Sequence, residues 1–143
     1  MRPGPTALAA LAAALLLAPP AAAAEDFKVI VHPQNPAAEI GREELSRLFL
    51  KRTTRWPEGE PVEPVEPADE ALRTRFADQV LGKRLASVRA YWNQQIFSGR
   101  EVPPLERAGD AEVVAWVREH RGAVGYVSPA ADVAGVKILS LKK

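Results

Sequence analysis

The stretch Leu45–Val65, LSRLFLKRTTRWPEGEPVEPV, decides the fold of this chain. Its first part places apolar side chains at positions i, i+3 and i+4, which are Leu45, Leu48 and Phe49. This spacing predicts an amphipathic helix over 42–51, followed by a polar loop around Trp56. A proline then recurs at every third position from 61 to 67, which predicts an edge strand or an extended segment rather than a central strand.

The rest of the sequence outside this stretch shows the same two periodicities. Helical spacing of apolar residues recurs in three further segments, each followed within two residues by a glycine. We therefore expect helices at 69–81, 85–97 and 110–120, and β-rich runs predict strands at 27–31, 123–127 and 136–141. The helix at 85–97 is expected to bury Leu85, Val88, Trp92 and Ile96. The order β-α-β-α-α-α-β-β predicts an α/β fold, in which helices flank a small mixed sheet.

The N-terminal segment 1–24 differs in composition from the rest and is typical of a signal peptide. Arg2 precedes an apolar run over 7–18, Pro19-Pro20 ends that run, and three alanines follow at 22–24. A retained membrane anchor is the alternative, but the apolar run is shorter than a membrane-spanning helix. We expect a signal peptide at 1–24 and a single domain at 25–143, with a periplasmic or secreted location and no membrane span after cleavage.

The composition of 25–143 excludes several functional classes. Its 119 residues hold 18 basic and 18 acidic side chains and no cysteine, so disulfides are excluded and a nucleic-acid partner is not expected. Neither His32 nor His120 has the spacing of a metal site, and His120 is expected to interact with the C-terminal end of a helix dipole. No nucleophile motif or phosphate loop is present, so we expect no catalytic residue, no metal, no cofactor and no enzymatic activity.

Binding is a more natural interpretation, because several expected loops carry hydrogen-bond donors. Basic residues form local groups, such as Lys51, Arg52 and Arg55, and the acids near each group favour a solvated helix surface. The alternative is that one group lines an anion site together with backbone N–H groups at the start of a helix. Trp56, Trp92 and Trp116 are expected to pack in the core, with a sugar platform as an alternative for Trp56 alone. The candidate ligand-binding residues are Asn35, Thr53, Thr54, Ser98, Gly99, Arg100 and Ser128.

Three stretches together resemble the periplasmic phosphate-binding proteins of ABC transporters. They are Leu45–Val65 as quoted, YWNQQIFSGREVPP at Tyr91–Pro104, and GAVGYVS at Gly122–Ser128. The resemblance implies a type II periplasmic-binding-protein-like fold, of which 119 residues supply one lobe. It also implies a solute-binding function, with phosphate or another small anion as ligand and an ABC transporter or an envelope sensor protein as partner.

The sequence departs from the family pattern at the expected phosphate loop. Glu70, Ala71 and Leu72 stand where the family has serine, glycine and threonine, and Glu66 stands where it has an arginine. A carboxylate does not stabilise a dianion where donors are needed. The alternative hypothesis is therefore a protein-interaction module of the cell envelope that retains the lobe fold without ligand binding. Either interpretation allows a dimer.

Overall fold

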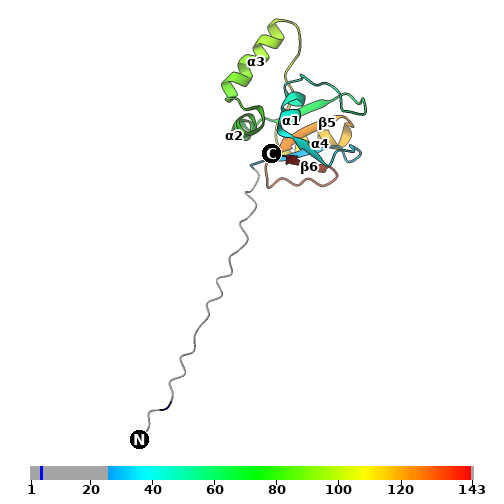
Figure 1. The fold of residues 1–143 in the computed structure, drawn as a ribbon, viewed down its shortest axis with the longest axis vertical. Coiled ribbons are helices and arrows are strands. Elements are labelled where there is room, and N and C mark those ends of the chain that lie inside the picture. Colours follow the sequence, from blue (N-terminus) through cyan, green and yellow to red (C-terminus); the bar gives the residue numbers. More distant parts are fainter. Residues whose placement is uncertain (1–3, 5–25, 143) are drawn as a thin grey trace.

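The computed structural model describes residues 4 and 26–142 (Figure 1). The signal peptide expected at 1–24 lies outside the described residues, except for Gly4. In the described part of the chain, no helix has both the length and the apolar character needed to cross a membrane.

One six-stranded mixed sheet organises the fold, with strand order β2-β6-β1-β5-β3-β4. β1 runs antiparallel to its neighbours β5 and β6, whereas β3 runs parallel to both β5 and β4, and β2 runs parallel to β6. The strands are β1 (Lys28–Val31), β2 (Glu39–Gly41), β3 (Glu63–Pro67), β4 (Leu105–Arg107), β5 (Ala123–Val127) and β6 (Lys137–Lys142).

The expected helices are confirmed, and they cover both faces of the sheet. They are α1 (Arg42–Phe49), α2 (Glu70–Phe76) continued by the π-helical turn η1 (Ala77–Leu81), α3 (Leu85–Phe97) and α4 (Asp110–Glu119). α1, α2 and η1 pack on one face through an apolar cluster that contains Phe49, Phe76 and Tyr126. α4 covers the other face through Val113, Val114 and Val117. The predicted α/β fold with flanking helices is therefore confirmed.

The prediction that 61–67 forms an edge strand is wrong, because β3 lies inside the sheet between β5 and β4. Successive N–H groups of a strand point to opposite sides. The N–H of Glu63 points toward β5, because it donates to the carbonyl of Gly122, the residue before β5, at 3.0 Å. The nitrogen of Pro64 therefore faces β4, whose pairing with β3 begins only at Val65. The nitrogen of Pro67 faces β5, whose pairing with β3 ends at Val65. Both prolines thus occupy ladder positions at which no N–H is required.

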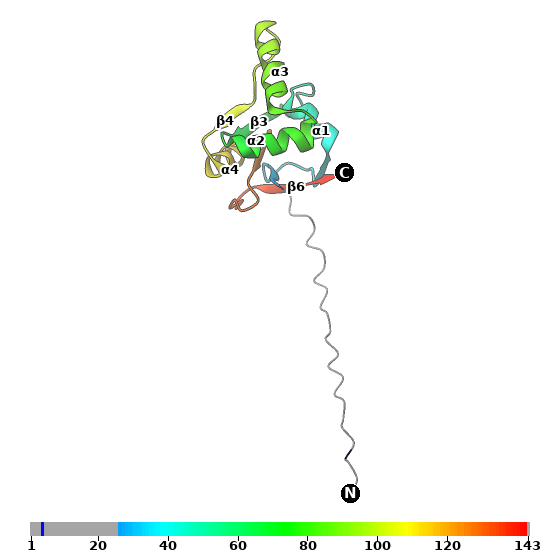
Figure 2. The ribbon, with the colours of Figure 1, turned by 90° about the vertical axis from the view of Figure 1, so that its left-hand side faces the viewer.

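α3 packs against η1 and the end of α1. Val88 and Trp92 form a small cluster with Leu50 and Ala77, and the Tyr91 hydroxyl donates to the Leu50 carbonyl at 2.7 Å. The far end of α3 projects from the body of the molecule (Figure 2). The expected burial of Ile96 is therefore wrong: it is 52% exposed, because no other element among residues 26–142 covers the last turn of α3.

Two of the quoted stretches meet at Gly122. The Trp56 side chain is buried, and its indole N–H donates to the Gly122 carbonyl at 2.9 Å. The same carbonyl accepts the backbone N–H of Glu63. Trp56 thus belongs to the core, as expected, and the sugar-platform alternative for this residue is wrong.

Candidate binding sites

A crevice lies where β3, β4 and β5 end and where α2 and α4 begin. Ligands of α/β proteins commonly bind outside the carboxyl ends of parallel strands, which makes this hollow of about 320 Å³ a candidate ligand site. Two residues at which the sequence departs from the family pattern, Ala71 and Leu72, line it. The full lining is Pro67, Asp69, Ala71, Leu72, Arg75, Ala108, Gly109, Asp110 and Ser128.

The chain's own carboxylates occupy the helix starts in this crevice. Asp69 caps α2 by accepting the Leu72 N–H at 2.9 Å. Asp110, in the first turn of α4, accepts both the backbone N–H of Ser128, at 3.0 Å, and its hydroxyl. Ser128, a candidate from the sequence, therefore donates to an internal acceptor. An anion entering the crevice would meet two carboxylates and the cation of Arg75.

A buried polar network lies beneath α2, beside the crevice. Arg73 donates to Glu66 at 2.8 Å and to Glu106 at 3.2 Å, and the Tyr126 hydroxyl donates to Glu66 at 3.2 Å. Burial raises the pKa of the Glu66 carboxyl despite the opposing effect of the Arg73 charge. Burial and the Glu66 carboxylate both raise the pKa of the Tyr126 hydroxyl. Glu66 thus serves the fold by holding α2 on the sheet.

The raised pKa of Glu66 predicts a specific pH dependence of stability. The folded state keeps the Glu66 proton to higher pH than the unfolded state, whose pKa is near 4.5, so this group stabilises the fold below that pH. The contribution is lost as pH rises through the folded-state pKa. We therefore expect the difference in unfolding free energy between wild type and Glu66→Gln to fall steadily as pH rises from 4 to 7 in urea titrations. A difference that grows with pH would contradict this assignment.

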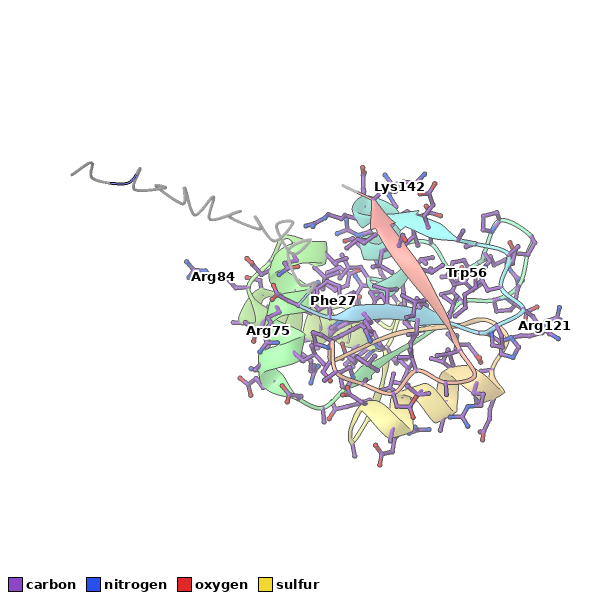
Figure 3. All side chains as sticks on the ribbon, turned by 90° about the horizontal axis from the view of Figure 1, so that it is seen from below. Phe27, Trp56, Arg75, Arg84, Arg121 and Lys142 are labelled. Carbon is purple, nitrogen blue, oxygen red and sulfur yellow. The ribbon has the colours of Figure 1, made fainter. Side chains whose placement is uncertain are left out.

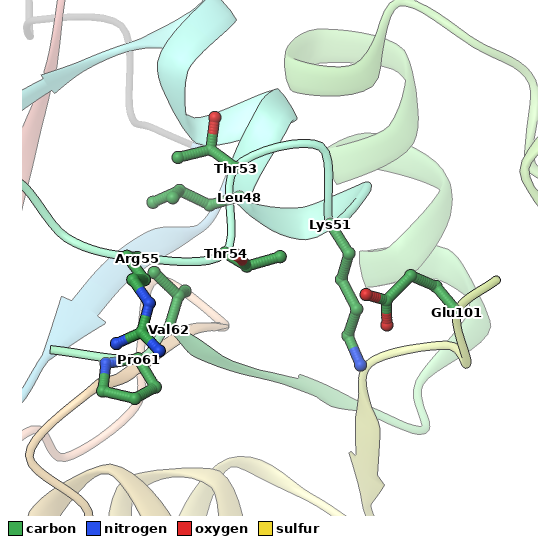
Figure 4. Close-up of a pocket in the computed structure, with 8 residues that line it drawn as sticks. All are labelled: Leu48, Lys51, Thr53, Thr54, Arg55, Pro61, Val62 and Glu101. Atoms are coloured by element: carbon green, nitrogen blue, oxygen red, sulfur yellow. The ribbon is translucent and has the colours of Figure 1, made fainter. Parts of the chain in front are cut away.

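A second hollow, of about 290 Å³, is lined by two cations, two threonines and the Glu101 carboxylate, and is here called the threonine pocket (Figure 4). The loop after α1 supplies both sequence candidates Thr53 and Thr54, together with Lys51 and Arg55. Within the described part of the chain, neither threonine hydroxyl makes a hydrogen bond. The full lining is Leu48, Lys51, Thr53, Thr54, Arg55, Pro61, Val62 and Glu101.

Lys51 enters this pocket from a conformation that usually requires glycine. Its φ is 54°, in the left-handed region, immediately after α1 ends. The Lys51 N–H donates to Leu48 O at 3.2 Å and the Arg52 N–H donates to Arg47 O at 2.9 Å, which is the Schellman pattern. A side chain in this conformation costs about 1 kcal/mol. The chain therefore places an ammonium group at the pocket at the expense of stability.

Arg55 forms the opposite wall of the threonine pocket. Its Nη1 donates to the Gly59 carbonyl at 2.8 Å, which fixes the guanidinium while leaving other N–H donors available. The sequence grouped Lys51 and Arg55 as basic neighbours and offered one such group as the lining of an anion site, but the seven candidate residues did not include them. Lys51 lies two positions before Thr53, and Arg55 lies one position after Thr54. This closeness in sequence could have indicated that the four residues share one site.

The remaining sequence candidates lie elsewhere. Asn35 is buried, its Oδ1 accepts the Ala37 N–H at 2.9 Å, and its Nδ2 has no partner in the described residues. It lies between two hollows of about 240 and 270 Å³. Ser98, Gly99 and Arg100 are exposed at the end of α3, where the Ser98 hydroxyl donates to Gln94 O at 2.8 Å. The seven candidates therefore occupy four separate locations, and only Thr53 and Thr54 share a pocket with cations from the same loop.

The histidines lie apart from these hollows. His120 follows α4, where its Nδ1–H donates to the Trp116 carbonyl at 2.8 Å, so the expected interaction with the helix C-terminus is confirmed. The two rings stack with centroids 3.6 Å apart, and the Arg107 guanidinium lies 4.6 Å from the Trp116 centroid. Among residues 4 and 26–142, no group of three or more histidine, aspartate or glutamate side chains is arranged to hold a metal ion.

Comparison with solved structures identifies the fold. An ABC-type phosphate transport receptor from Vibrio cholerae superposes with a TM-score of 0.58 at 18% identity, over 82% of this chain and 46% of the receptor. The chain has the fold of one lobe of these proteins. PstS from Borrelia burgdorferi gives a TM-score of 0.63 at 13% identity, over 82% of this chain and 47% of PstS. The chain thus spans less than half the length of either protein. No protein-family model and no curated protein matches the sequence.

Proposed function

We propose that this chain is an exported, non-catalytic protein of the solute-binding type that holds phosphate or another small anion in the threonine pocket. One observation carries the proposal: a single hollow is lined by Lys51, Thr53, Thr54 and Arg55. The Lys51 and Arg55 cations, together with two threonine hydroxyls that make no hydrogen bond within the described chain, supply charge-assisted hydrogen bonds of the kind that bind oxyanions, against one carboxylate, that of Glu101. The likeness in fold to phosphate transport receptors supports the same ligand class.

The crevice at the strand ends is a weaker candidate for this anion. Asp69 and Asp110 already fill the positions at the starts of α2 and α4 where an anion would be stabilised. The crevice and the threonine pocket share no lining residue, so the two locations can be tested separately. Figure 3 shows Arg75, the crevice cation, on the side of the molecule away from Trp56, the residue that follows Arg55 in the chain. Because one lobe cannot close over a solute, we expect weak binding, with a dissociation constant on the order of 1 mM.

The variant Lys51→Gly tests the proposal sharply, because it changes stability and affinity in opposite directions. Glycine relieves the left-handed backbone strain, so the free energy of unfolding should rise by about 1 kcal/mol. Removal of the ammonium group should weaken phosphate binding about five- to tenfold. Calorimetric titration of inorganic phosphate and sulfate measures the affinity, and urea denaturation measures the stability.

Arg75→Ala is the matched control, because it removes the cation of the crevice and leaves the threonine pocket intact. It should bind phosphate as wild type does. Loss of binding in Arg75→Ala with normal binding in Lys51→Gly would place the anion in the crevice. No heat from any small anion at 10 mM would refute the binding function altogether.

A second candidate function is a protein-interaction module of the cell envelope. The exposed end of α3 favours it, because the Phe97 side chain is 92% exposed. An ABC transporter or a sensor ectodomain would be the partner in either case. Crosslinking in intact cells tests this candidate. Recovery of the protein without any crosslinked partner would refute it.

A further inference from the structure

The threonine pocket contains one carboxylate, which a site for a simple anion does not need. Glu101 lies in the loop between α3 and β4, and it lines the pocket together with Lys51 and Arg55. A carboxylate beside an oxyanion is unfavourable, because the two like charges repel each other. Glu101 therefore either opposes the ligand or contacts a part of the ligand that is not anionic.

The fold holds Glu101 at the pocket from a second segment of the chain. The backbone turns back after α3 at Gly99, whose φ is 68°. The Tyr91 hydroxyl on α3 donates to the carbonyl of Leu50, the residue before Lys51, at 2.7 Å. This hydrogen bond joins α3, and with it the segment that carries Glu101, to the end of α1 that carries Lys51.

The Lys51 and Glu101 side chains lie on the same side of the pocket, with Arg55 on the other side of Thr54 (Figure 4). Within residues 26–142, neither Lys51 nor Glu101 takes part in an ion pair. Both therefore keep their hydrogen-bonding capacity toward a group placed between them. From Lys51 that group would receive N–H bonds, and to Glu101 it would give a proton in a hydrogen bond.

A hydroxyl group satisfies both charges at once. It donates its proton to the carboxylate, and its lone pairs accept an N–H bond from the ammonium group. A second anion in that place would be repelled by Glu101, and a ligand ammonium group would be repelled by Lys51. The position between these two side chains thus favours a neutral hydroxyl.

The size and the apolar wall of the pocket indicate a ligand larger than inorganic phosphate. The pocket measures about 290 Å³, whereas a cavity of about 150 Å³ already holds a benzene ring. Leu48, Pro61 and Val62 contribute carbon surface to its lining. Inorganic phosphate has no carbon with which to cover this surface, and a short carbon chain or a sugar ring has.

We infer that the ligand of the threonine pocket is a hydroxylated organic phosphate, a monoester of a polyol or a sugar, and that Glu101 selects it. This inference rests on the proposed function, because the phosphate group takes the place of the anion among the cations and threonines. The carbon chain lies along the apolar wall. One ligand hydroxyl donates to the Glu101 carboxylate and accepts from the Lys51 ammonium group.

Calorimetric titration with glycerol phosphate and propyl phosphate tests the inference, because the two esters differ in their hydroxyls. Wild type should bind glycerol phosphate about tenfold more tightly. Glu101→Ala should abolish this preference by weakening glycerol phosphate alone, and unchanged binding of propyl phosphate shows that the pocket is intact. Glu101→Gln, which keeps an acceptor oxygen, should retain part of the preference. Glu119→Ala is the matched control, since it removes an exposed carboxylate of α4 outside the pocket lining, and it should behave as wild type.

The same titrations separate failure of the inference from failure of the proposed function. If wild type bound both esters equally well, or if the preference persisted in Glu101→Ala, the inference would be wrong and the anion site would stand. If neither ester nor inorganic phosphate gave heat, the proposed function itself would be wrong. Protein that cosediments with phosphatidylglycerol vesicles but gives no heat with soluble glycerol phosphate would show a lipid headgroup as the ligand and overturn the inference.

Discussion

Gly122→Ala should lower the free energy of unfolding by more than about 3 kcal/mol, a larger effect than any other alanine substitution of a glycine in the described chain. A Cβ at this position would lie 1.8 Å from the Pro61 carbonyl oxygen. That oxygen belongs to the backbone, so β5 and the segment before β3 would have to separate. Their separation would also disturb the Gly122 carbonyl, which accepts both the Trp56 indole N–H and the Glu63 N–H.

Urea denaturation followed by tryptophan fluorescence measures this loss, since Trp56 reports on the same junction. Gly41→Ala is the matched control, because an added Cβ there has no neighbour within 4 Å. It should change the unfolding free energy by less than about 1 kcal/mol. Equal stabilities for the two variants would show that the contact between the Trp56 loop and β5 is not a constraint on the fold.

Arg73→Met should cost about 3 kcal/mol of stability at pH 8. The substitution removes the cation that pairs with Glu66 and Glu106, and it leaves the largely buried Glu66 carboxylate without its counter-charge. The loss should shrink toward acidic pH, because Glu66 then takes up a proton. The double variant Arg73→Met with Glu66→Gln should recover part of the lost stability, since no buried charge is left.

Arg47→Met provides the comparison for an exposed ion pair. Arg47 contacts Glu43 at 2.6 Å, but both side chains are more than half exposed, so its loss should cost no more than about 0.5 kcal/mol. Chemical denaturation of the three variants at pH 5 and pH 8 gives the comparison. If Arg73→Met and Arg47→Met were equally mild at pH 8, the network beneath α2 would not hold the helix on the sheet.

Periodicity predicted most of the fold because each long element buries one regular stripe. The Leu45, Leu48 and Phe49 spacing located α1, and the valines of 110–120 located α4. β2 and β4 were missed, since three residues are too few to show alternation. The central position of β3 was also missed, because it depends on where β4 and β5 begin and end, which the sequence of β3 does not contain.

The candidate sites could be predicted less well than the fold. Loop donors are recognisable by residue type, but their convergence depends on tertiary structure, which separated Asn35, Ser98 and Ser128. Thr53 and Thr54 met Lys51 and Arg55 in one pocket because all four lie on one short loop. Asp110 could not be identified as the acceptor for Ser128, since the two residues are 18 positions apart and meet only after α4 packs on the sheet.

The most direct test of the central proposal is a phosphate titration followed by amide ¹H–¹⁵N chemical shifts. Binding in the threonine pocket should shift the amides of residues 51–55 and of Glu101, with saturation in the millimolar range. Amides of the crevice, such as those of Asp69, Asp110 and Ser128, should stay unchanged. Shifts confined to the crevice residues, or no shifts at 10 mM phosphate, would contradict the proposal.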